Sequence, residues 1–162
     1  MQSKKLAKTL GISLATALLL LPLATNAYAA KGDQGVDWSK YQGANGLWGS
    51  ENDKFSISQI GGYYNGTFVP QSTYGTQVAN TIALNKRAHT YIYAQFSGRS
   101  QADQMLDYYL PKVQTPKGSI VMLDVESGNP DTDSVLYALR RVQNAGYTAV
   151  LYGYKSFLVN HI

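Results

Sequence analysis

The sequence predicts an α/β fold built on a parallel sheet. After a first short strand, segments of strand character alternate with segments of helical spacing, and this alternation is typical of parallel strands covered by helices. The 162 residues, of which 44% are hydrophobic and 15% charged, suit one globular domain. Sheets of this kind carry their functional groups at the C-terminal ends of the strands, so we expect the site there.

The first half of the domain is predicted to contain two strands and a helix. A short strand begins at Val36, and Asp37 is expected at its end. Residues 55–60 alternate between apolar and polar and predict a second strand, which the glycines at 61–62 are expected to end. Helical spacing predicts a helix over residues 72–88. That spacing comes from Tyr74, Val78, Ile82 and Ala83.

The second half continues the alternation. Aromatic and β-branched residues predict a third strand over 89–96, closed by Gly98, and residues 101–110 predict a helix that Pro111 stops. A fourth strand runs through residues 119–127. The later elements are a helix capped by Asp131 or Asp133 and ended by Gly146, a fifth strand over 147–152 and a helix beginning near Ser156. The two complete helices are expected to bury Ala102, Met105, Leu106 and Tyr109, and Val135, Leu136, Leu139 and Val142.

The fourth strand carries two carboxylates spaced by two residues. Strand alternation places Met122, Asp124 and Glu126 on one face, with the two acids roughly 6.5–7 Å apart at Cβ. Like charges at this distance resist joint ionisation, so one pKa is expected to rise. A proton donor beside an ionised carboxylate is what cleavage of a glycosidic bond requires. The plainer alternative is two solvated acids where a strand meets its loop.

Polar side chains fall at the ends of several predicted strands, and the ends of parallel strands meet at one rim. This convergence favours a catalytic site over isolated surface acids. The residues concerned are Asp37, Gln95, Asp124, Glu126 and Tyr152.

Residues 1–30 have the pattern of a secretory signal peptide. Three lysines precede an apolar run, and the small residues at 27–30 suit cleavage after Ala29 or Ala30. Lys4, Lys5 and Lys8 are three of the 14 basic residues, which leaves 11 against 10 acidic ones in the mature chain. This balance argues against nucleic-acid binding and against electrostatic membrane attachment. We expect a secreted protein without stable membrane insertion after cleavage.

Other kinds of catalytic site find little support. The chain has no cysteine, so it has neither disulfides nor thiolate chemistry. Its two histidines, His89 and His161, do not have metal-ligand spacing, and a serine triad would need His89 at the wrong end of its strand. No phosphate-binding or dinucleotide-binding motif is present. We expect no metal and no cofactor.

Three motifs together resemble glycoside hydrolase family 25, the N-acetylmuramidase lysozymes of bacteria and phages. They are Gly-Val-Asp-Trp-Ser at 35–39, Leu-Asp-Val-Glu at 123–126 and Leu-Tyr-Gly-Tyr at 151–154. The resemblance covers residues 31–162 and implies an irregular TIM-like (β/α)-barrel of five strand–helix units followed by three further strands. Because the chain stops at Ile162, we expect an incomplete barrel that lacks the last three strands and is weakly stable and poorly active.

The resemblance also implies roles for the acids. Glu126 would be the general acid, and Asp124 would activate water, act as nucleophile or orient the N-acetyl group of the substrate. Asp37 would be an auxiliary acid. From the residues themselves, Glu126 lies nearer the cleft, and Asp124 sits deeper, where hydrogen bonds could keep it ionised. The proposed substrate-binding residues are Tyr91, Tyr93, Gln95, Tyr152 and Tyr154, with Gln95 in place of a histidine that family members often carry.

The expected function is therefore that of a secreted, cell-wall-associated peptidoglycan hydrolase acting as a monomer on glycan strands. It would cleave the β-1,4 bond between N-acetylmuramic acid and N-acetylglucosamine. Two alternatives stay open: a non-catalytic remnant that binds wall glycan, and a glycosidase acting on capsule or chitin.

Overall fold

A computed structural model describes residues 31–162, and the predicted signal peptide at 1–30 lies outside the described residues. The observed elements confirm the predicted alternation of strands and helices. In chain order they are β1 (Gly35–Trp38), the 3-10 helix η1 (Lys40–Gln42), β2 (Phe55–Tyr64), β3 (Thr67–Pro70), α1 (Tyr74–Ala83), β4 (Arg87–Gln95), α2 (Gly98–Tyr109), the 3-10 helix η2 (Leu110–Lys112), β5 (Ile120–Asp124), α3 (Thr132–Asn144), β6 (Thr148–Tyr152) and α4 (Lys155–His161).

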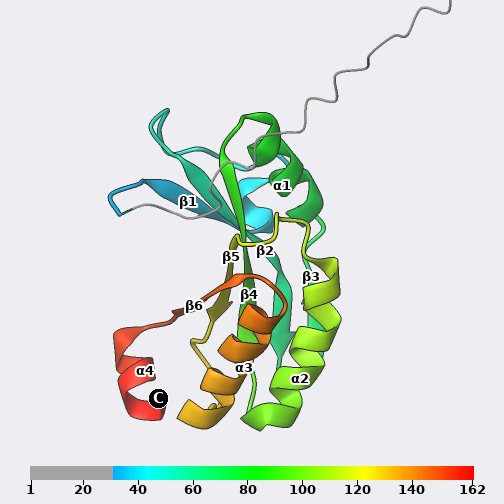
Figure 1. The fold of residues 1–162 in the computed structure, drawn as a ribbon, viewed down its shortest axis with the longest axis vertical. Coiled ribbons are helices and arrows are strands. Elements are labelled where there is room, and N and C mark those ends of the chain that lie inside the picture. Colours follow the sequence, from blue (N-terminus) through cyan, green and yellow to red (C-terminus); the bar gives the residue numbers. More distant parts are fainter. Residues whose placement is uncertain (1–30) are drawn as a thin grey trace, which may run out of the picture.

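Five of the strands form a parallel sheet in the order β1-β2-β4-β5-β6. Strand β3 runs antiparallel to β2. It pairs with the second half of β2, on the same edge of that strand where β1 pairs with the first half. Helices α1, α2 and α3 lie together on one side of this sheet, where α1 contacts β2 and β4, and α3 contacts β6 (Figure 1). The fold class predicted from the sequence, an α/β arrangement with five parallel strands and helices between them, is therefore correct.

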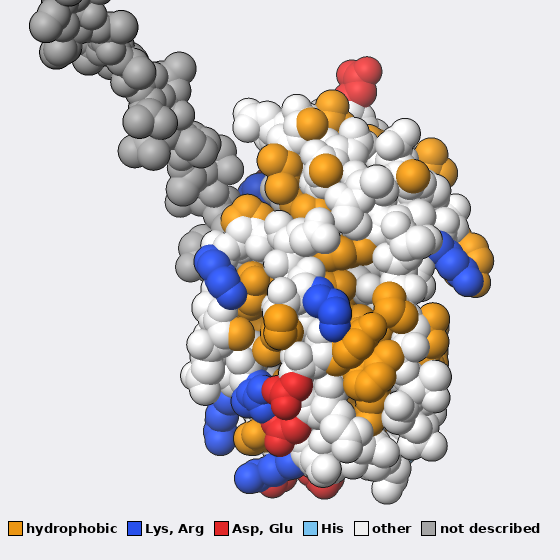
Figure 2. Space-filling model, turned by 90° about the vertical axis from the view of Figure 1, so that its right-hand side faces the viewer, with side chains coloured by type: hydrophobic (Ala, Val, Ile, Leu, Met, Phe, Trp, Pro, Cys, Tyr) orange, Lys and Arg blue, Asp and Glu red, His pale blue; other side chains and the backbone are white. Residues whose placement is uncertain are grey.

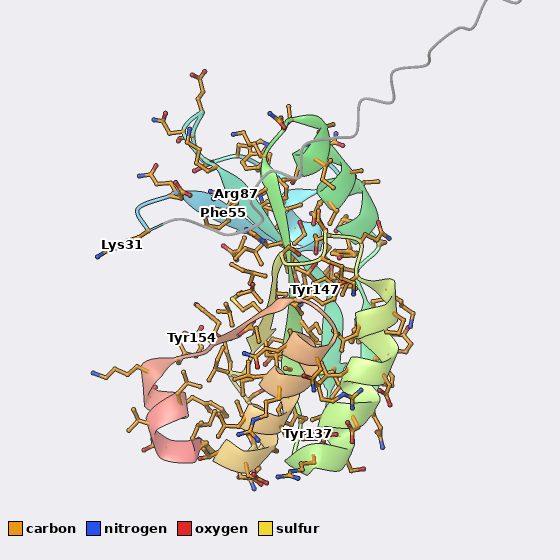
Figure 3. The ribbon with its side chains drawn as sticks, in the orientation of Figure 1. Lys31, Phe55, Arg87, Tyr137, Tyr147 and Tyr154 are labelled. Atoms are coloured by element: carbon orange, nitrogen blue, oxygen red, sulfur yellow. The ribbon has the colours of Figure 1, made fainter. Side chains whose placement is uncertain are left out.

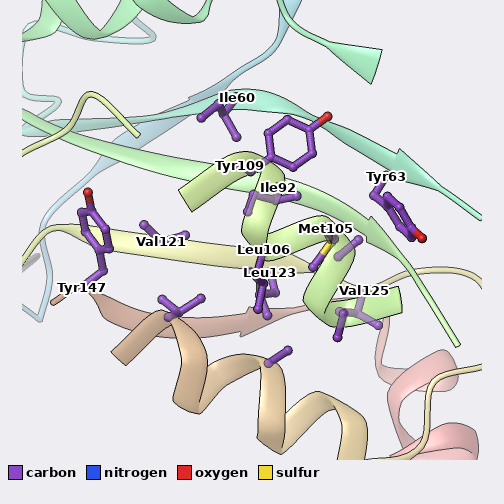
Figure 4. Close-up of a cluster of buried hydrophobic side chains, with 14 of the residues drawn as sticks. Ile60, Tyr63, Ile92, Met105, Leu106, Tyr109, Val121, Leu123, Val125 and Tyr147 are labelled. Carbon is purple, nitrogen blue, oxygen red and sulfur yellow. The ribbon is translucent and has the colours of Figure 1, made fainter. Parts of the chain in front are cut away.

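The hydrophobic core lies between the sheet and these helices (Figure 4). Alternation along each strand selects the residues that enter it, and on β5 Val121 and Leu123 are fully buried while Met122 between them is not. Helix α2 contributes the four residues predicted from its spacing, all of them fully buried. These are Ala102, Met105, Leu106 and Tyr109.

Strand β2 corrects one prediction from the sequence. The glycines at 61–62 do not end the strand, which continues to Tyr64 and turns through Asn65 and Gly66 into β3. An asparagine and a glycine with positive φ, 48° and 99°, form this tight hairpin. Asn-Gly is a hairpin signal in its own right, and β3 was missed because the strand was expected to stop before it.

Helix α1 is shorter than the predicted span of 72–88. It ends at Ala83, and Asn85 then adopts a left-handed conformation with φ of 56°, which suits the residue after a helix end. Strand β4 accordingly starts at Arg87, two residues earlier than expected. Two residues at apolar helical positions face water instead of the core: Ile82 is 48% exposed and Leu136 on α3 is 45% exposed.

The helices are joined across their outer surface by ion pairs. Arg141 of α3 pairs with Asp103 and Asp107 of α2, and Arg99 pairs with Asp133. Figure 2 shows acidic and basic side chains together in the lower part of this side of the molecule, and a group of hydrophobic side chains beside them. Within residues 31–162, no helix combines the length and apolar character that crossing a membrane requires.

Candidate active site

The face of the sheet opposite the helices carries a pocket of about 430 Å³. It begins at the N-terminal ends of β1 and β2 and reaches the C-terminal ends of β5 and β6. In Figure 3, Phe55 and Arg87 lie side by side in the upper part of the molecule, and Tyr154 lies in the lower left part, just before α4. The pocket is lined by Gly35, Val36, Asp37, Phe55, Ile57, Tyr91, Met122, Asp124, Glu126 and Tyr152.

Three carboxyl groups meet in this pocket because of where their strands end. Asp37 is the next-to-last residue of β1, Asp124 is the last residue of β5, and Glu126 follows two residues later. Between the two acids, Val125 is fully buried, and its amide donates to the carbonyl of Tyr152 at 2.8 Å. Because Val125 points into the core, the residues on either side of it, Asp124 and Glu126, point to the pocket face of the sheet. This holds for Glu126 even though β5 ends at Asp124.

The environment of Asp124 differs from the one expected. Its Oδ1 atom is buried and has no hydrogen-bond partner among the described residues, so hydrogen bonds do not hold the carboxylate ionised. Burial, and to a smaller extent the negative charges of Glu126 and then Asp37, together raise the pKa of Asp124 to about 7. Asp124 therefore keeps its proton to a higher pH than an ordinary aspartate, and the predicted rise of one pKa of the pair falls on this residue.

Two tyrosines complete the walls of the pocket. Burial and the charges of Asp37, Asp124 and Glu126 raise the pKa of Tyr91, so this side chain stays a neutral hydroxyl. Tyr152 is 50% exposed at the end of β6, and Glu126 is the main cause of its raised pKa. Both residues were predicted to bind substrate, and the structure brings them to the same pocket as the three acids.

The other three residues predicted to bind substrate lie around the pocket without lining it. Tyr93 stacks on Tyr64, and its hydroxyl is 2.8 Å from the Ser127 hydroxyl. The side chain of Gln95 packs toward Gly128 in the turn after the acids. Tyr154 is 61% exposed at the start of α4. Tyr64 itself escaped prediction, because the strand that carries it was expected to end at the glycines.

His89 belongs to the interior of the sheet and not to the acids. It is fully buried beside Phe55, and its Nδ1 accepts a hydrogen bond from the Ile120 amide at 3.1 Å. Burial, with a smaller contribution from Arg87, lowers the pKa of His89 to about 4, so the imidazole is neutral. In the part of the chain that the structure covers, no group of three or more His, Cys, Asp or Glu side chains could hold a metal ion.

Comparison with known proteins identifies the family. Residues 36–162 match the family described as glycosyl hydrolases family 25. Among solved structures, the CTP1L endolysin is similar with a TM-score of 0.64 and 27% identity, over 78% of this chain and 46% of the endolysin. The modular autolysin LytC from Streptococcus pneumoniae is similar with a TM-score of 0.62 and 16% identity, over 82% of this chain and 35% of LytC.

A second structure of LytC, in complex with a synthetic peptidoglycan ligand, gives a TM-score of 0.62 at 15% identity. The chain spans less than half the length of each of these proteins. No curated protein matches it significantly. The family match nevertheless extends from β1 to the last described residue and includes all three acids of the pocket, and the chain therefore belongs to glycosyl hydrolases family 25.

Proposed function

We propose that this protein is a secreted peptidoglycan hydrolase, a lysozyme of the N-acetylmuramidase type. It cleaves the β-1,4 bond between N-acetylmuramic acid and N-acetylglucosamine in the glycan strand. The observation that carries the proposal is the set of three carboxyl groups in one open pocket, one of which retains a proton near neutral pH. Glycosidic bond cleavage uses such a set, a proton donor beside an ionised carboxylate.

In this proposal Glu126 donates the proton. It is half-buried after the end of β5 and lines the pocket, and its side chain is one methylene longer than those of the two aspartates. The proton passes to the glycosidic oxygen, the bond from C1 to that oxygen breaks, and the oxygen keeps the electron pair. Water then supplies hydroxyl to C1 and returns a proton to the site, so the enzyme ends the cycle unchanged.

Asp124 is the second carboxylate. Asp124 lines the pocket, where its carboxylate could accept a hydrogen bond from the N–H of a sugar N-acetyl group. A donor at this position favours the ionised form of Asp124, and the proton that it gives up becomes available to Glu126. Asp37 acts as the auxiliary acid, since its charge already contributes to the raised pKa of Asp124. The chemistry needs neither metal nor cofactor.

The substrate class rests on two supports. Tyr91 and Tyr152 give the pocket aromatic surface that suits the faces of sugar rings, and LytC has been captured with a synthetic peptidoglycan ligand. Action on the wall requires passage across the cytoplasmic membrane, and residues 1–30 have the pattern of a secretory signal peptide. We propose that the protein works there as a monomer, without a nucleic-acid partner.

The test is loss of turbidity of purified cell walls, compared between the protein and its Glu126→Gln variant. Gln keeps the size of the side chain and removes the transferable proton, so the rate should fall roughly 10²–10⁴-fold. Glu51→Gln is the matched control, because Glu51 is exposed and lies away from the acid-lined pocket. The reducing ends released by the active protein should be those of N-acetylmuramic acid.

The alternatives predict other results. A wall-binding remnant would show no turbidity loss in either form and equal retention on walls. A capsule or chitin glycosidase would release reducing ends from glycans without muramic acid. Unchanged turnover in Glu126→Gln would contradict the assigned role of Glu126.

A further inference from the structure

The hairpin of β2 and β3 carries an aromatic side chain that neither the predicted site nor the pocket accounts for. Tyr64 is the last residue of β2, 38% exposed, and its ring stacks on Tyr93 with centroids 4.9 Å apart and planes at 23°. One ring face of Tyr64 is thus supported by protein. An exposed aromatic ring with a rigid support is the kind of surface on which a sugar ring stacks.

A β-bulge places Tyr64 on this side of the sheet. Gln59 pairs with Tyr91, but the next pairs along β4 are Gly61 with Ile92 and Gly62 with Tyr93, so Ile60 is an extra residue in the strand. After the bulge, Tyr64 aligns with Gln95 on the pocket side, and Tyr63 enters the core with no exposure. An unbroken ladder would exchange the sides of the two tyrosines.

Gly62 provides the space in which the Tyr64 ring lies. A Cβ atom at position 62 would be 2.3 Å from the Tyr64 ring, so any other residue would push the ring out of its place. Strand geometry permits other residues here, because Gly62 has no positive φ. Gly62 is therefore needed because it leaves room for the Tyr64 ring, and not because the backbone turns there.

The same stack is connected to the acids. The Tyr93 hydroxyl is 2.8 Å from the Ser127 hydroxyl, and Ser127 directly follows Glu126. The pKa of Tyr64 is raised by burial, then by Tyr93 and Tyr41, and also by the charge of Asp124, so the phenol lies within electrostatic reach of the catalytic pocket. A sugar on Tyr64 would continue the glycan strand from that pocket across the end of β2.

We propose that Tyr64, held by Tyr93 and Gly62, forms a stacking subsite for a pyranose ring of the glycan strand beside the three acids. Tyr93 is in addition a positioning residue, which holds the turn that carries Glu126 through Ser127. This inference rests on the proposed function, because it assigns part of the same substrate. The apolar face of the sugar contacts the Tyr64 ring, and the sugar hydroxyls face water.

The subsite is tested by affinity in the inactive Glu126→Gln background, which separates binding from turnover. The probe is a soluble oligosaccharide of alternating N-acetylglucosamine and N-acetylmuramic acid, titrated calorimetrically into the full chain. Adding Tyr64→Ala should weaken binding about tenfold, in line with an aromatic contact. Tyr64→Phe, which keeps the ring, should bind within about twofold of the parent. Equal affinity of the Tyr64→Ala and parent proteins would overturn the subsite.

Tyr93→Phe tests the positioning role in the active protein. It keeps the stack and removes the hydrogen bond to Ser127, so kcat should fall while KM stays unchanged. A rise in KM with constant kcat would overturn that role. Thermal unfolding of each variant checks the fold, and Tyr64→Leu, which keeps apolar volume without an aromatic ring, replaces Tyr64→Ala if the latter unfolds.

Failure of this inference is distinguishable from failure of the proposed function. If Glu126→Gln removes turnover and Tyr64→Ala binds normally, the hydrolase stands and the subsite falls. If Glu126→Gln retains turnover, the catalytic assignment falls, whatever the affinity of the Tyr64 variants.

Discussion

The two faces of the central sheet are made from alternate residues of the same strands, yet they differ in almost every physical respect. On β4, Ile92 and Ala94 have no exposure under the helices, whereas Tyr91 and Tyr93 on the other face are half-buried among polar groups. The first face removes apolar surface from water, and the second holds a carboxyl oxygen, Oδ1 of Asp124, that is buried without a hydrogen-bond partner among the described residues. Stability is therefore concentrated on one face, and the other face gives up some of it to hold the acids.

The largest expected effect compares neighbours on β5. Leu123→Ala removes a fully buried side chain from the helix-covered face and should lower the free energy of unfolding by about 2–5 kcal/mol. Met122→Ala, one residue away on the pocket face, should cost less than about half as much, because Met122 is already partly in water. Urea unfolding measures both. Equal losses would show that the two faces contribute alike.

The next effect is a gain in stability. Asp124→Asn removes a carboxyl group whose pKa is raised to about 7, and should stabilise the protein at neutral pH by roughly 1–2 kcal/mol, allowing for partial solvent contact. The folded state holds the Asp124 proton more tightly than the unfolded chain. Wild-type stability therefore falls between about pH 4 and pH 7, and the variant's advantage should grow over that interval. No advantage at pH 8 would contradict the unfavourable burial of Asp124.

The pH dependence of activity gives a smaller and sharper test. The acids must retain one proton to work, so kcat/KM should decline above about pH 7, where Asp124 ionises. Asp37→Asn removes one of the charges that raise this pKa, and should shift the decline to lower pH. Glu51→Gln serves as the control and should leave the profile in place. If kcat/KM of Asp37→Asn declined at the same pH as in the parent protein or at a higher pH, the electrostatic coupling between Asp37 and Asp124 would be excluded.

The smallest effect concerns the outer surface of the helix layer. Arg141→Leu removes the ion pairs with Asp103 and Asp107 and should cost about 0.5–1 kcal/mol, less in concentrated salt. Arg140→Leu, at an exposed neighbouring position, should have almost no effect. Thermal unfolding at low and high salt measures the difference. A loss comparable to that of Leu123→Ala would place these ion pairs among the main stabilising contacts.

The same division explains how much could be predicted from sequence. Periodicity identified the four core residues of α2, because their helical spacing places them on one side of the helix. It also placed Ile82 and Leu136 in the core, where the structure instead exposes them, because burial depends on the neighbouring elements as well. Strand ends also identified Asp37, Asp124 and Glu126, which the structure brings into one pocket. The bulge at Ile60 was not predictable, because a single extra residue shows only in the pairing with β4. That Oδ1 of Asp124 has no hydrogen-bond partner was not predictable either, because it depends on which groups from other parts of the chain lie around it.

The bulge makes the length of β2 a constraint separate from its composition. Deleting Ile60 would give an unbroken ladder in which Tyr63 and Tyr64 keep their present partners, Ala94 and Gln95, and therefore their present sides. One extra residue after Gly61 would instead pair Tyr63 with Gln95, which would bring Tyr63 out and Tyr64 in. Engineering of this hairpin should therefore vary residues freely only after its residue count is fixed.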